Sequence, residues 1–142
     1  MKVKELMTPS VIRIGAEESV AVAARMLAHY NIGALPVCGR DGSLQGMLTD
    51  RDIVTRCLAS GNAPEATKVR QVMTSKVHTV PSEMDAGAAA HLMGRQQIRR
   101  LPVVEDGKLC GMLSLGDLAQ SLENAYDASD ALSGITSNIS ER

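Results

Sequence analysis

Residues 32–54 read IGALPVCGRDGSLQGMLTDRDIV and residues 98–119 read IRRLPVVEDGKLCGMLSLGDLA, so the chain contains nearly the same stretch twice. The repetition continues upstream, because residues 2–54 can be laid over residues 68–119 with one single-residue gap in the loop after Cys38. Neither copy is long enough to enclose a core of much size alone, so each is expected to bury its apolar face against the other. The sequence therefore predicts one compact module of two related halves, with a cleft of approximate two-fold symmetry.

Both copies contain the same order of local signals. Residues 3–7 and 69–73 predict a short helical turn, and the β-branched residues 11–14 and 77–80 predict a first strand. Ser19 and Asp85 are good N-caps for helices over 20–30 and 86–96. Apolar runs on both sides of a turn-rich stretch then predict a hairpin, after which Thr49 or Ser114 opens a last helix. The predicted order is helical turn, strand, helix, strand, strand, helix, twice over, which is an α+β fold.

These signals also predict the boundaries along the chain. Repeat 1 is expected over 2–60, a linker over 61–67 and repeat 2 over 68–122. The remaining residues 123–142 form a tail that is rich in Ser, Asp and Asn and poor in large apolar side chains. We expect a weakly held helix followed by disorder in this tail, or a segment that touches a partner chain.

The composition narrows the classes of function. The 142 residues include no Phe or Trp, so aliphatic side chains and eight Met must fill the core, and a flat ligand inside cannot stack on rings. A net charge of −1 with scattered Lys and Arg gives no electrostatic footprint for nucleic acid or an anionic membrane. No apolar run approaches the roughly 20 residues that span a bilayer, and residues 1–5 lack the apolar stretch of a signal peptide. We therefore expect a cytosolic protein that binds neither nucleic acid nor membrane.

The residue types that carry metal or catalytic chemistry are dispersed. Cys38, Cys57 and Cys110 show no CxxC spacing, and their odd number argues against a complete disulfide framework, so buried thiols are expected. The three His show no zinc-ligand spacing, and we predict no metal site. No activated nucleophile, P-loop or Gly-x-Ser-x-Gly elbow is visible, so we do not expect an enzyme.

The recurring segments resemble a known family. Residues 32–37 followed by 46–53, with Met7-Thr8 upstream, resemble a CBS domain, and the second copy repeats the pattern at 98–103 and 111–118 with Met73-Thr74. Two tandem copies over about 2–122 resemble a CBS pair, also called a Bateman module, and residues 32–39 and 46–54 are similar to stand-alone bacterial CBS proteins of the hypoxic-response type. The resemblance implies two CBS repeats packed with pseudo-two-fold symmetry.

The resemblance further implies two clefts between the repeats, each able to hold AMP, ADP, ATP or S-adenosylmethionine. The residues implied for the first cleft are Thr49, Asp52, Val77, His78, Arg99, Arg100 and Pro102. Those implied for the second are Ser114, Asp117, Val11, Ile12, Gly33, Ala34 and Pro36. In the first cleft Asp52 would accept from the ribose hydroxyls, Val77 and His78 would flank the adenine, and the arginines would meet the phosphates. Because Gly33-Ala34 stands where the second copy has Arg99-Arg100, the second cleft would be empty or prefer a less charged ligand.

The chemistry of the Thr/Ser-x-x-Asp motif allows this use and also a simpler one. A carboxylate only accepts hydrogen bonds, which suits two vicinal hydroxyls, and free N–H groups at a helix start favour phosphate oxygens. The same spacing matches a capping box, in which the acid stabilises the helix start and binds no ligand. Likewise, Arg99 and Arg100 suit phosphates but could be an ordinary solvated pair.

From these features we predict a non-catalytic regulatory sensor that binds an adenosine-containing ligand between its repeats and signals to an unidentified partner protein. The ligand is regulatory, and no catalytic cofactor is expected. A homodimer is expected from the resemblance, since pairs of this family associate through their helices. The alternatives are a dimeric interaction scaffold without nucleotide binding, and a metal- or redox-responsive stress protein using Cys38 and a histidine.

Overall fold

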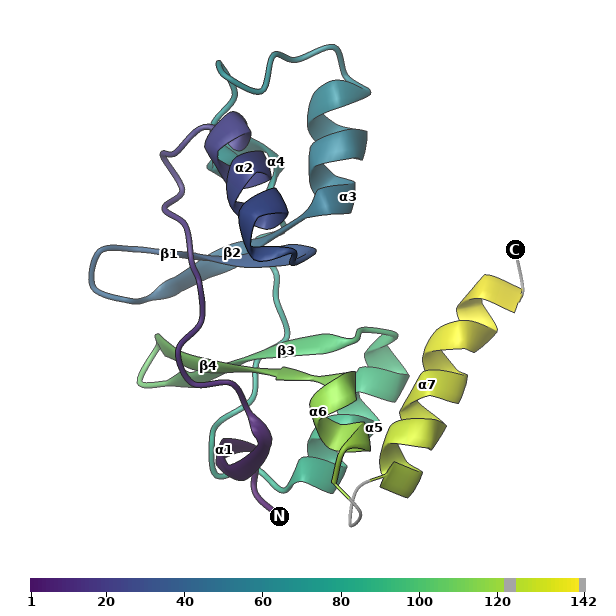
Figure 1. The fold of residues 1–142 in the computed structure, drawn as a ribbon. Coiled ribbons are helices and arrows are strands. Elements are labelled where there is room, and N and C mark those ends of the chain that lie inside the picture. Colours follow the sequence, from purple (N-terminus) through teal and green to yellow (C-terminus); the bar gives the residue numbers. More distant parts are fainter. Residues whose placement is uncertain (122–124, 141–142) are drawn as a thin grey trace. The chain divides into compact units, whose positions relative to one another are not determined.

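The computed structural model describes residues 1–121 and 125–140. The chain divides into two compact units, and each contains one hairpin. We call Ile12–Val77 the first-hairpin unit, and Met1–Val11 together with His78–Arg142 the second-hairpin unit. Figure 1 shows the elements of both units.

The first-hairpin unit contains helix α2 (Val20–Tyr30), strands β1 (Ala34–Cys38) and β2 (Leu44–Thr49), and a last helix. Ser19 caps α2 by accepting from Val22 N, and Asn31 ends it in the left-handed conformation. The last helix begins as α3 (Asp50–Asp52) and continues as a π-helix, η1 (Ile53–Leu58), with the i→i+5 bond from Ala59 N to Val54 O. The short helix α4 (Val69–Val72) completes the unit.

The second-hairpin unit repeats this plan with α5 (Ala86–Gln96), β3 (Arg100–Glu105), β4 (Lys108–Ser114) and α6 (Leu115–Ala119). It also contains the short helix α1 (Val3–Leu6) and the C-terminal helix α7 (Ala125–Ser140). Both strand pairs are antiparallel with the same register shift after the buried Pro-Val step. The α+β fold and the pairwise repetition agree with the sequence prediction.

The predicted first strands are reduced to single paired residues. Ile14 forms a parallel bridge with Val37, and Val80 forms the equivalent bridge with Val103. The flanking residues of 11–14 and 77–80 form no ladder because only Ile14 and Val80 meet the hairpin edge. The β-branched composition therefore predicted the extended conformation correctly and overestimated the pairing.

The helical turn of each repeat packs with the hairpin of the other repeat. In the second-hairpin unit, Thr8 and Met112 exchange backbone hydrogen bonds of 2.9 Å; in the first-hairpin unit, Met47 and Thr74 do the same at 2.8–2.9 Å. The structural units therefore differ from the sequence repeats: each repeat contributes its Met-Thr turn to the unit that contains the other repeat's Gly-Met-Leu strand.

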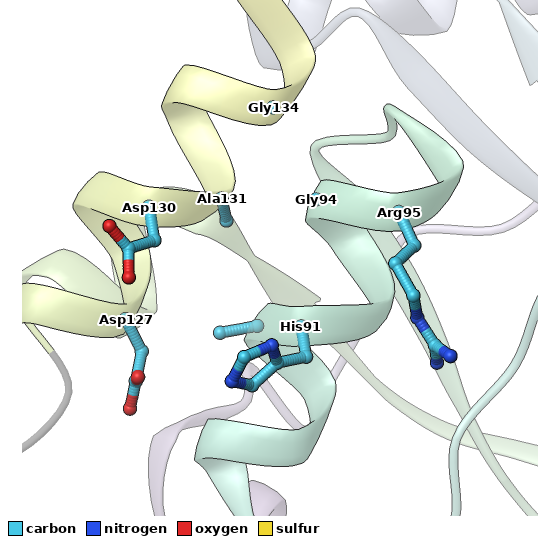
Figure 2. Close-up of a pocket in the computed structure, with 8 residues that line it drawn as sticks. His91, Gly94, Arg95, Asp127, Asp130, Ala131 and Gly134 are labelled. Atoms are coloured by element: carbon cyan, nitrogen blue, oxygen red, sulfur yellow. The ribbon is translucent and has the colours of Figure 1, made fainter.

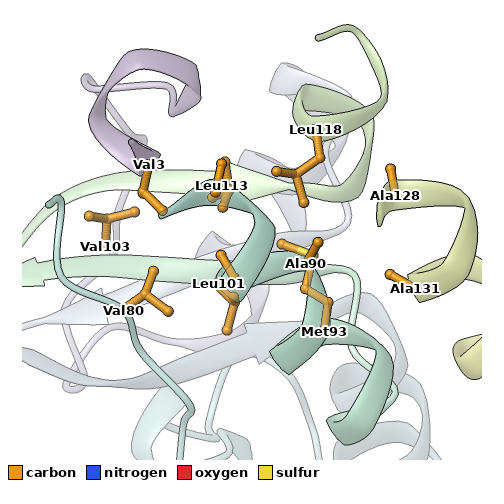
Figure 3. Packing of buried hydrophobic residues seen from close by; sticks show 12 residues of the cluster. Val3, Val80, Ala90, Met93, Leu101, Val103, Leu113, Leu118, Ala128 and Ala131 are labelled. Atoms are coloured by element: carbon orange, nitrogen blue, oxygen red, sulfur yellow. The ribbon is translucent and has the colours of Figure 1, made fainter. Parts of the chain in front are cut away.

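The core of the second-hairpin unit is aliphatic, as the composition requires. Leu101, Val103 and Leu113 from the hairpin pack with Ala90 and Met93 from α5 and are fully buried, as Figure 3 shows. An equivalent cluster in the other unit includes Leu35, Val37 and Leu48. Alanine is frequent on α5, so this helix can approach its neighbours closely.

The C-terminal tail forms a longer helix than its composition predicts. Helix α7 lies along α5 and α6 (Figure 1) and buries Ala128, Ala131 and Ile135. The contact is close because a Cβ at Gly134 would lie 3.0 Å from Gly94 O. Small residues on both helices thus replace the large apolar side chains whose absence suggested a weak helix. The disorder expected at the end of the tail concerns residues 141 and 142, which lie outside the described residues.

Candidate ligand-binding motifs at two helix starts

Both Thr/Ser-x-x-Asp motifs lie where a hairpin strand passes directly into a helix. Thr49 is paired with Ala34 across the first hairpin, and Ser114 is paired with Arg100 across the second. One residue later, Asp50 N donates to Gly33 O at 3.0 Å, and the equivalent bond from Leu115 N to Arg99 O is 2.9 Å long. The strand therefore fixes where each helix begins.

Each motif forms a complete capping box. Asp52 Oδ2 accepts from Thr49 N at 3.0 Å, and Asp52 N donates to Thr49 Oγ1 at 3.1 Å. The second motif repeats both bonds, from Ser114 N to Asp117 Oδ2 at 2.9 Å and from Asp117 N to Ser114 Oγ at 3.0 Å. The structural role that the sequence left open is therefore present in both copies. It occupies one oxygen of each carboxylate.

The second oxygen of Asp52 faces a cation that the sequence analysis missed. Arg56 Nε lies 3.8 Å from Asp52 Oδ1, and Arg56 Nη1 donates to Met73 O at 3.2 Å and to Val72 O at 3.4 Å. Arg56 thus connects the acid of the first motif to the carboxyl end of α4. The i, i+4 spacing from Asp52 was the available signal. The equivalent position in the second repeat is Ser121, so the cation has no counterpart there.

The first helix start does not have the free N–H groups that were expected to favour phosphate. Asp50 N donates to Gly33 O, Arg51 N to Asp50 Oδ1 at 2.8 Å, and Asp52 N to Thr49 Oγ1. Asp50 also adds a second carboxylate at this helix start. Side chains and the neighbouring strand therefore already accept from these backbone groups, and the expectation that they bind phosphate stays a prediction.

The second helix start has a different charge. Leu115 and Gly116 replace Asp50 and Arg51, so the carboxylate that accepts from Arg51 N has no equivalent. Directly opposite residues in an antiparallel pair project to the same face, so Arg100 and Ser114 do so. Both Arg99 and Arg100 are exposed. Arg100 is thus beside the serine of its own hairpin.

The other predicted residues are positioned as follows within their own units. Pro36 and Pro102 are buried in β1 and β3, and Gly33 and Ala34 are half-buried. Val11, Ile12 and Val77 are half-buried and His78 is exposed. Ile12 and Val77 belong to the first-hairpin unit, and Val11 and His78 to the second. The predicted grouping of these residues in clefts between the repeats stays a prediction.

The three thiols are free, and burial raises the pKa of two of them. Cys38 and Cys57 are buried and Cys110 is half-buried. Burial raises the pKa of the Cys38 thiol, an effect that the nearby Arg13 opposes, and burial likewise raises the pKa of Cys110. Over 1–121 and 125–140, no three His, Cys, Asp or Glu side chains gather into a group that could hold a metal ion. None of the helices in these ranges is both long and apolar enough to cross a bilayer.

Comparison with known proteins gives one consistent result. The family model described as "CBS domain" matches residues 3–59 and 69–124. The CBS domain-containing protein YhcV of Bacillus subtilis is 38% identical over 134 residues, which cover 94% of this chain and 94% of that protein.

Two solved structures extend the comparison. The crystal structure of Hypoxic Response Protein I with two coordinated zinc ions has a TM-score of 0.79 at 33% identity and covers 86% of this chain and 99% of that one. The CBS domain pair of protein MJ0100, in complex with 5-methylthioadenosine and S-adenosyl-L-methionine, has a TM-score of 0.75 at 26% identity. It covers 84% of this chain and 98% of that one. These matches confirm the predicted CBS-pair fold and the similarity to the hypoxic-response type.

Proposed function

This chain belongs to the CBS-domain family as a tandem CBS pair, and from that membership we propose that it is a non-catalytic sensor of an adenosine-containing small molecule. The observation that carries the proposal is the MJ0100 complex, whose two ligands share an adenosine group. This chain duplicates an acid at a helix start, which suits the ribose of such a group. AMP, ADP, ATP and S-adenosylmethionine are the candidate ligands.

We assign the ribose to Asp52 and Asp117. Each carboxylate uses Oδ2 within its capping box, so Oδ1 is the oxygen that would accept from a ribose hydroxyl. Asp52 is nearly buried, with 12% of its side chain exposed, and a hydrogen bond to a charged acceptor contributes more than one between neutral groups. Val77 and His78 would flank the adenine of the first ligand, and Val11 and Ile12 that of the second.

We assign phosphate binding to Arg99 and Arg100. Their guanidinium groups offer forked, charge-assisted hydrogen bonds, which adenosine alone could not use. Ligands with phosphates are therefore expected to bind more tightly than adenosine. Thr49 would supply a hydroxyl for the same ligand, and Ser114 would supply one for the second ligand.

Occupancy would be signalled by differential affinity. A ligand that bridges both repeats stabilises a closed arrangement only by the difference between its affinities for the closed and open forms. The closed form, as a homodimer, then presents a different surface to its regulated partner. No chemical step is required for this response.

The direct test combines two measurements on the full chain. Mass spectrometry of small molecules released from the purified, denatured protein should detect an adenosine compound, and calorimetry should rank ATP or AMP above adenosine. If no adenosine compound is released and none of the candidate ligands binds at millimolar concentration, the sensor proposal is wrong and an interaction scaffold is the better description.

A metal-responsive role is the second candidate, because the related Hypoxic Response Protein I holds two coordinated zinc ions. Metal analysis of protein purified without a chelator tests it. A stoichiometric transition metal would favour this role, and its loss in a Cys38→Ser variant would implicate the thiol. Metal-free protein that binds an adenosine ligand would exclude the role.

A further inference from the structure

Arg56 joins the acid of the first motif to a segment that is distant in the sequence. Its Nε lies 3.8 Å from Asp52 Oδ1, and its Nη1 donates to Val72 O at 3.4 Å and to Met73 O at 3.2 Å. These two carbonyls lie at the carboxyl end of α4, 16 and 17 residues further along the chain. All four residues belong to the first-hairpin unit. One guanidinium group therefore connects the motif to the end of α4.

The geometry leaves Asp52 Oδ1 able to accept from a ligand. At 3.8 Å the contact between Arg56 and Asp52 is an ion pair that is longer than a hydrogen bond. The Nη1 group of Arg56 donates to backbone carbonyls instead, and Asp52 Oδ2 accepts within the capping box. The guanidinium thus lies beside Oδ1, so a ribose hydroxyl and Arg56 can both be close to the carboxylate.

The two backbone acceptors hold Arg56 in place before any ligand binds. With 52% of its side chain exposed, an arginine without such partners would sample several rotamers. Asp52, in contrast, is only 12% exposed, and a carboxylate with so little access to water is stabilised by a cation nearby. Because the ordering of Arg56 occurs on folding, it does not reduce the free energy of a later binding step.

The segment that Arg56 holds leads to the predicted adenine contact. From the end of α4 the chain passes through Met73 and Thr74 to Val77, which the proposed function places beside the adenine of the first ligand. Thr74 and Met47 exchange backbone hydrogen bonds of 2.8–2.9 Å, which attach this segment to β2. A ligand that contacts both Asp52 and Val77 would therefore span the two parts of the unit that Arg56 connects.

We propose that Arg56 is a positioning residue, which holds the end of α4 and the segment leading to Val77 at the correct distance from the ribose acceptor Asp52. The inference rests on the proposed function, because it concerns the same ligand. Its consequence is specificity. Arg56 favours a ligand that offers ribose hydroxyls together with adenine, whereas a ligand without those hydroxyls contacts only one of the two parts.

The second repeat supports its last helix in a different way. Ser121 stands at the position of Arg56. Helix α7 packs along α5 and α6, and Figure 2 shows its contact with α5, where Ala131 and Gly134 lie against Gly94. In addition, Arg56 lies on the π-helix η1, whereas the counterpart α6 is α-helical, and π-helical turns are frequent at functional sites. The inference therefore concerns the first motif alone.

Calorimetry on the full chain, with AMP and 2′,3′-dideoxy-AMP as probes, tests this role. Both probes are titrated into chains that carry Asp117→Asn, so that the acid of the second motif is absent. Without a further substitution, AMP should bind more tightly than the dideoxy probe. Arg56→Gln should weaken AMP binding by about fivefold or more and dideoxy-AMP binding by less than about twofold. Arg40→Gln removes an exposed cation at the opposite end of the hairpin from Thr49 and should change both affinities by less than about twofold.

A merely structural role of Arg56 would give a different pattern. If Arg56 only stabilised the fold, Arg56→Gln would lower the melting temperature and leave the ratio of the two affinities unchanged. Arg56→Lys keeps a cation but loses the planar fork that reaches Asp52 and the α4 carbonyls together, so it should retain part of the preference for AMP. The same comparison can be made with Arg56→Lys if the Gln variant does not fold.

The possible failures are distinguishable. Equal AMP affinity with and without Arg56→Gln, or an equal loss for both probes, would overturn the inference and leave the proposed function intact. Tighter AMP binding by Arg56→Gln would also overturn it, because Arg56 would then compete with the ribose for Asp52 Oδ1. If the Asp117→Asn chain does not bind AMP, the inference is wrong as well. Titration of AMP, ATP and S-adenosylmethionine into the parent chain then shows whether the proposed function survives.

Discussion

At the scale of single residues, Asp52 accepts the capping-box hydrogen bond from Thr49 N and is also proposed to accept one from the ribose. Two substitutions separate these two roles. Asp52→Ala removes both and should reduce the free energy of unfolding by about 1 kcal/mol, because the cap at Thr49 N is lost. Asp52→Asn keeps an oxygen for the cap and removes the charge, so it should be the more stable variant. Both should lose about 1 to 3 kcal/mol of ligand affinity. Urea unfolding and calorimetry with AMP or ATP provide the two readouts, and unchanged affinity in Asp52→Asn would contradict the ribose assignment.

Gly111 explains why the Gly-Met-Leu and Met-Thr segments recur together. A Cβ at Gly111 would lie 2.6 Å from Met7 Sδ and 2.9 Å from Thr8 O, so there is no room for a side chain where α1's turn crosses β4. Gly111→Ala should therefore destabilise the protein by about 1 to 3 kcal/mol in denaturant unfolding. Gly116→Ala is the matched control: its Cβ would make an ordinary 3.7 Å contact in α6, and it should be neutral or slightly stabilising. Equal stability of the two variants would show that the crossing is not tight.

At the scale of elements, α1 is attached partly by charge. Lys2 and Lys4 both bond the Glu83 carboxylate, with 2.6 Å from Lys4 Nζ, and these hydrogen bonds lower the pKa of Glu83 to about 2. A lowered folded-state pKa stabilises the fold above the unfolded pKa near 4.5, and this stabilisation is lost as the pH falls towards 2. Hydrogen exchange of the amides in residues 3–8 should therefore accelerate between pH 4.5 and 2 beyond the intrinsic rate. Glu83→Gln should abolish that pH dependence; if it persists, other groups attach the turn.

Helix α7 depends on small residues rather than on a large apolar face. A side chain at Gly134 would meet Gly94 O at 3.0 Å and Gly94 Cα at 3.3 Å, so Gly134→Val should separate the two helices. Amides of residues 125–137 should then lose hydrogen-exchange protection while those of β3 and β4 keep theirs. Ser133→Val places the same side chain on the exposed neighbour and should preserve protection. Loss of protection throughout the unit would instead show that α7 is part of its folding core.

At the scale of the whole molecule, ligand binding and folding are linked. A ligand at 100 times its dissociation constant that binds only the folded chain should raise the free energy of unfolding by about 2.7 kcal/mol. The proposed ligand contacts come from both repeats, so the stabilisation by ATP or AMP should be reduced by Asp52→Asn and also by replacing Arg99 and Arg100 with Gln. A thermal shift that the Arg variants leave unchanged would contradict the phosphate assignment.

Much of this architecture could be predicted because its signals are local or duplicated. The caps at Ser19 and Asp85, the helices that follow and both hairpins were read from spacing and turn chemistry, and the repetition of motifs indicated the family. Arg56 was missed because its partners Val72 O and Met73 O are distant in sequence. The occupied N–H groups at Asp50 and Arg51 were missed because that arrangement depends on a strand carbonyl and a side-chain rotamer.

The sequence by itself determined the duplicated α+β pattern and the family, since hydrophobic period, caps and turn residues act within a few neighbouring positions. Only the tertiary structure decided which segments pack together. Met7-Thr8 packs on Gly111, Met73-Thr74 packs on Gly46, and α7 contacts Gly94. These contacts depend on distances of about 3 Å between residues far apart in the chain. A local sequence pattern does not encode such distances.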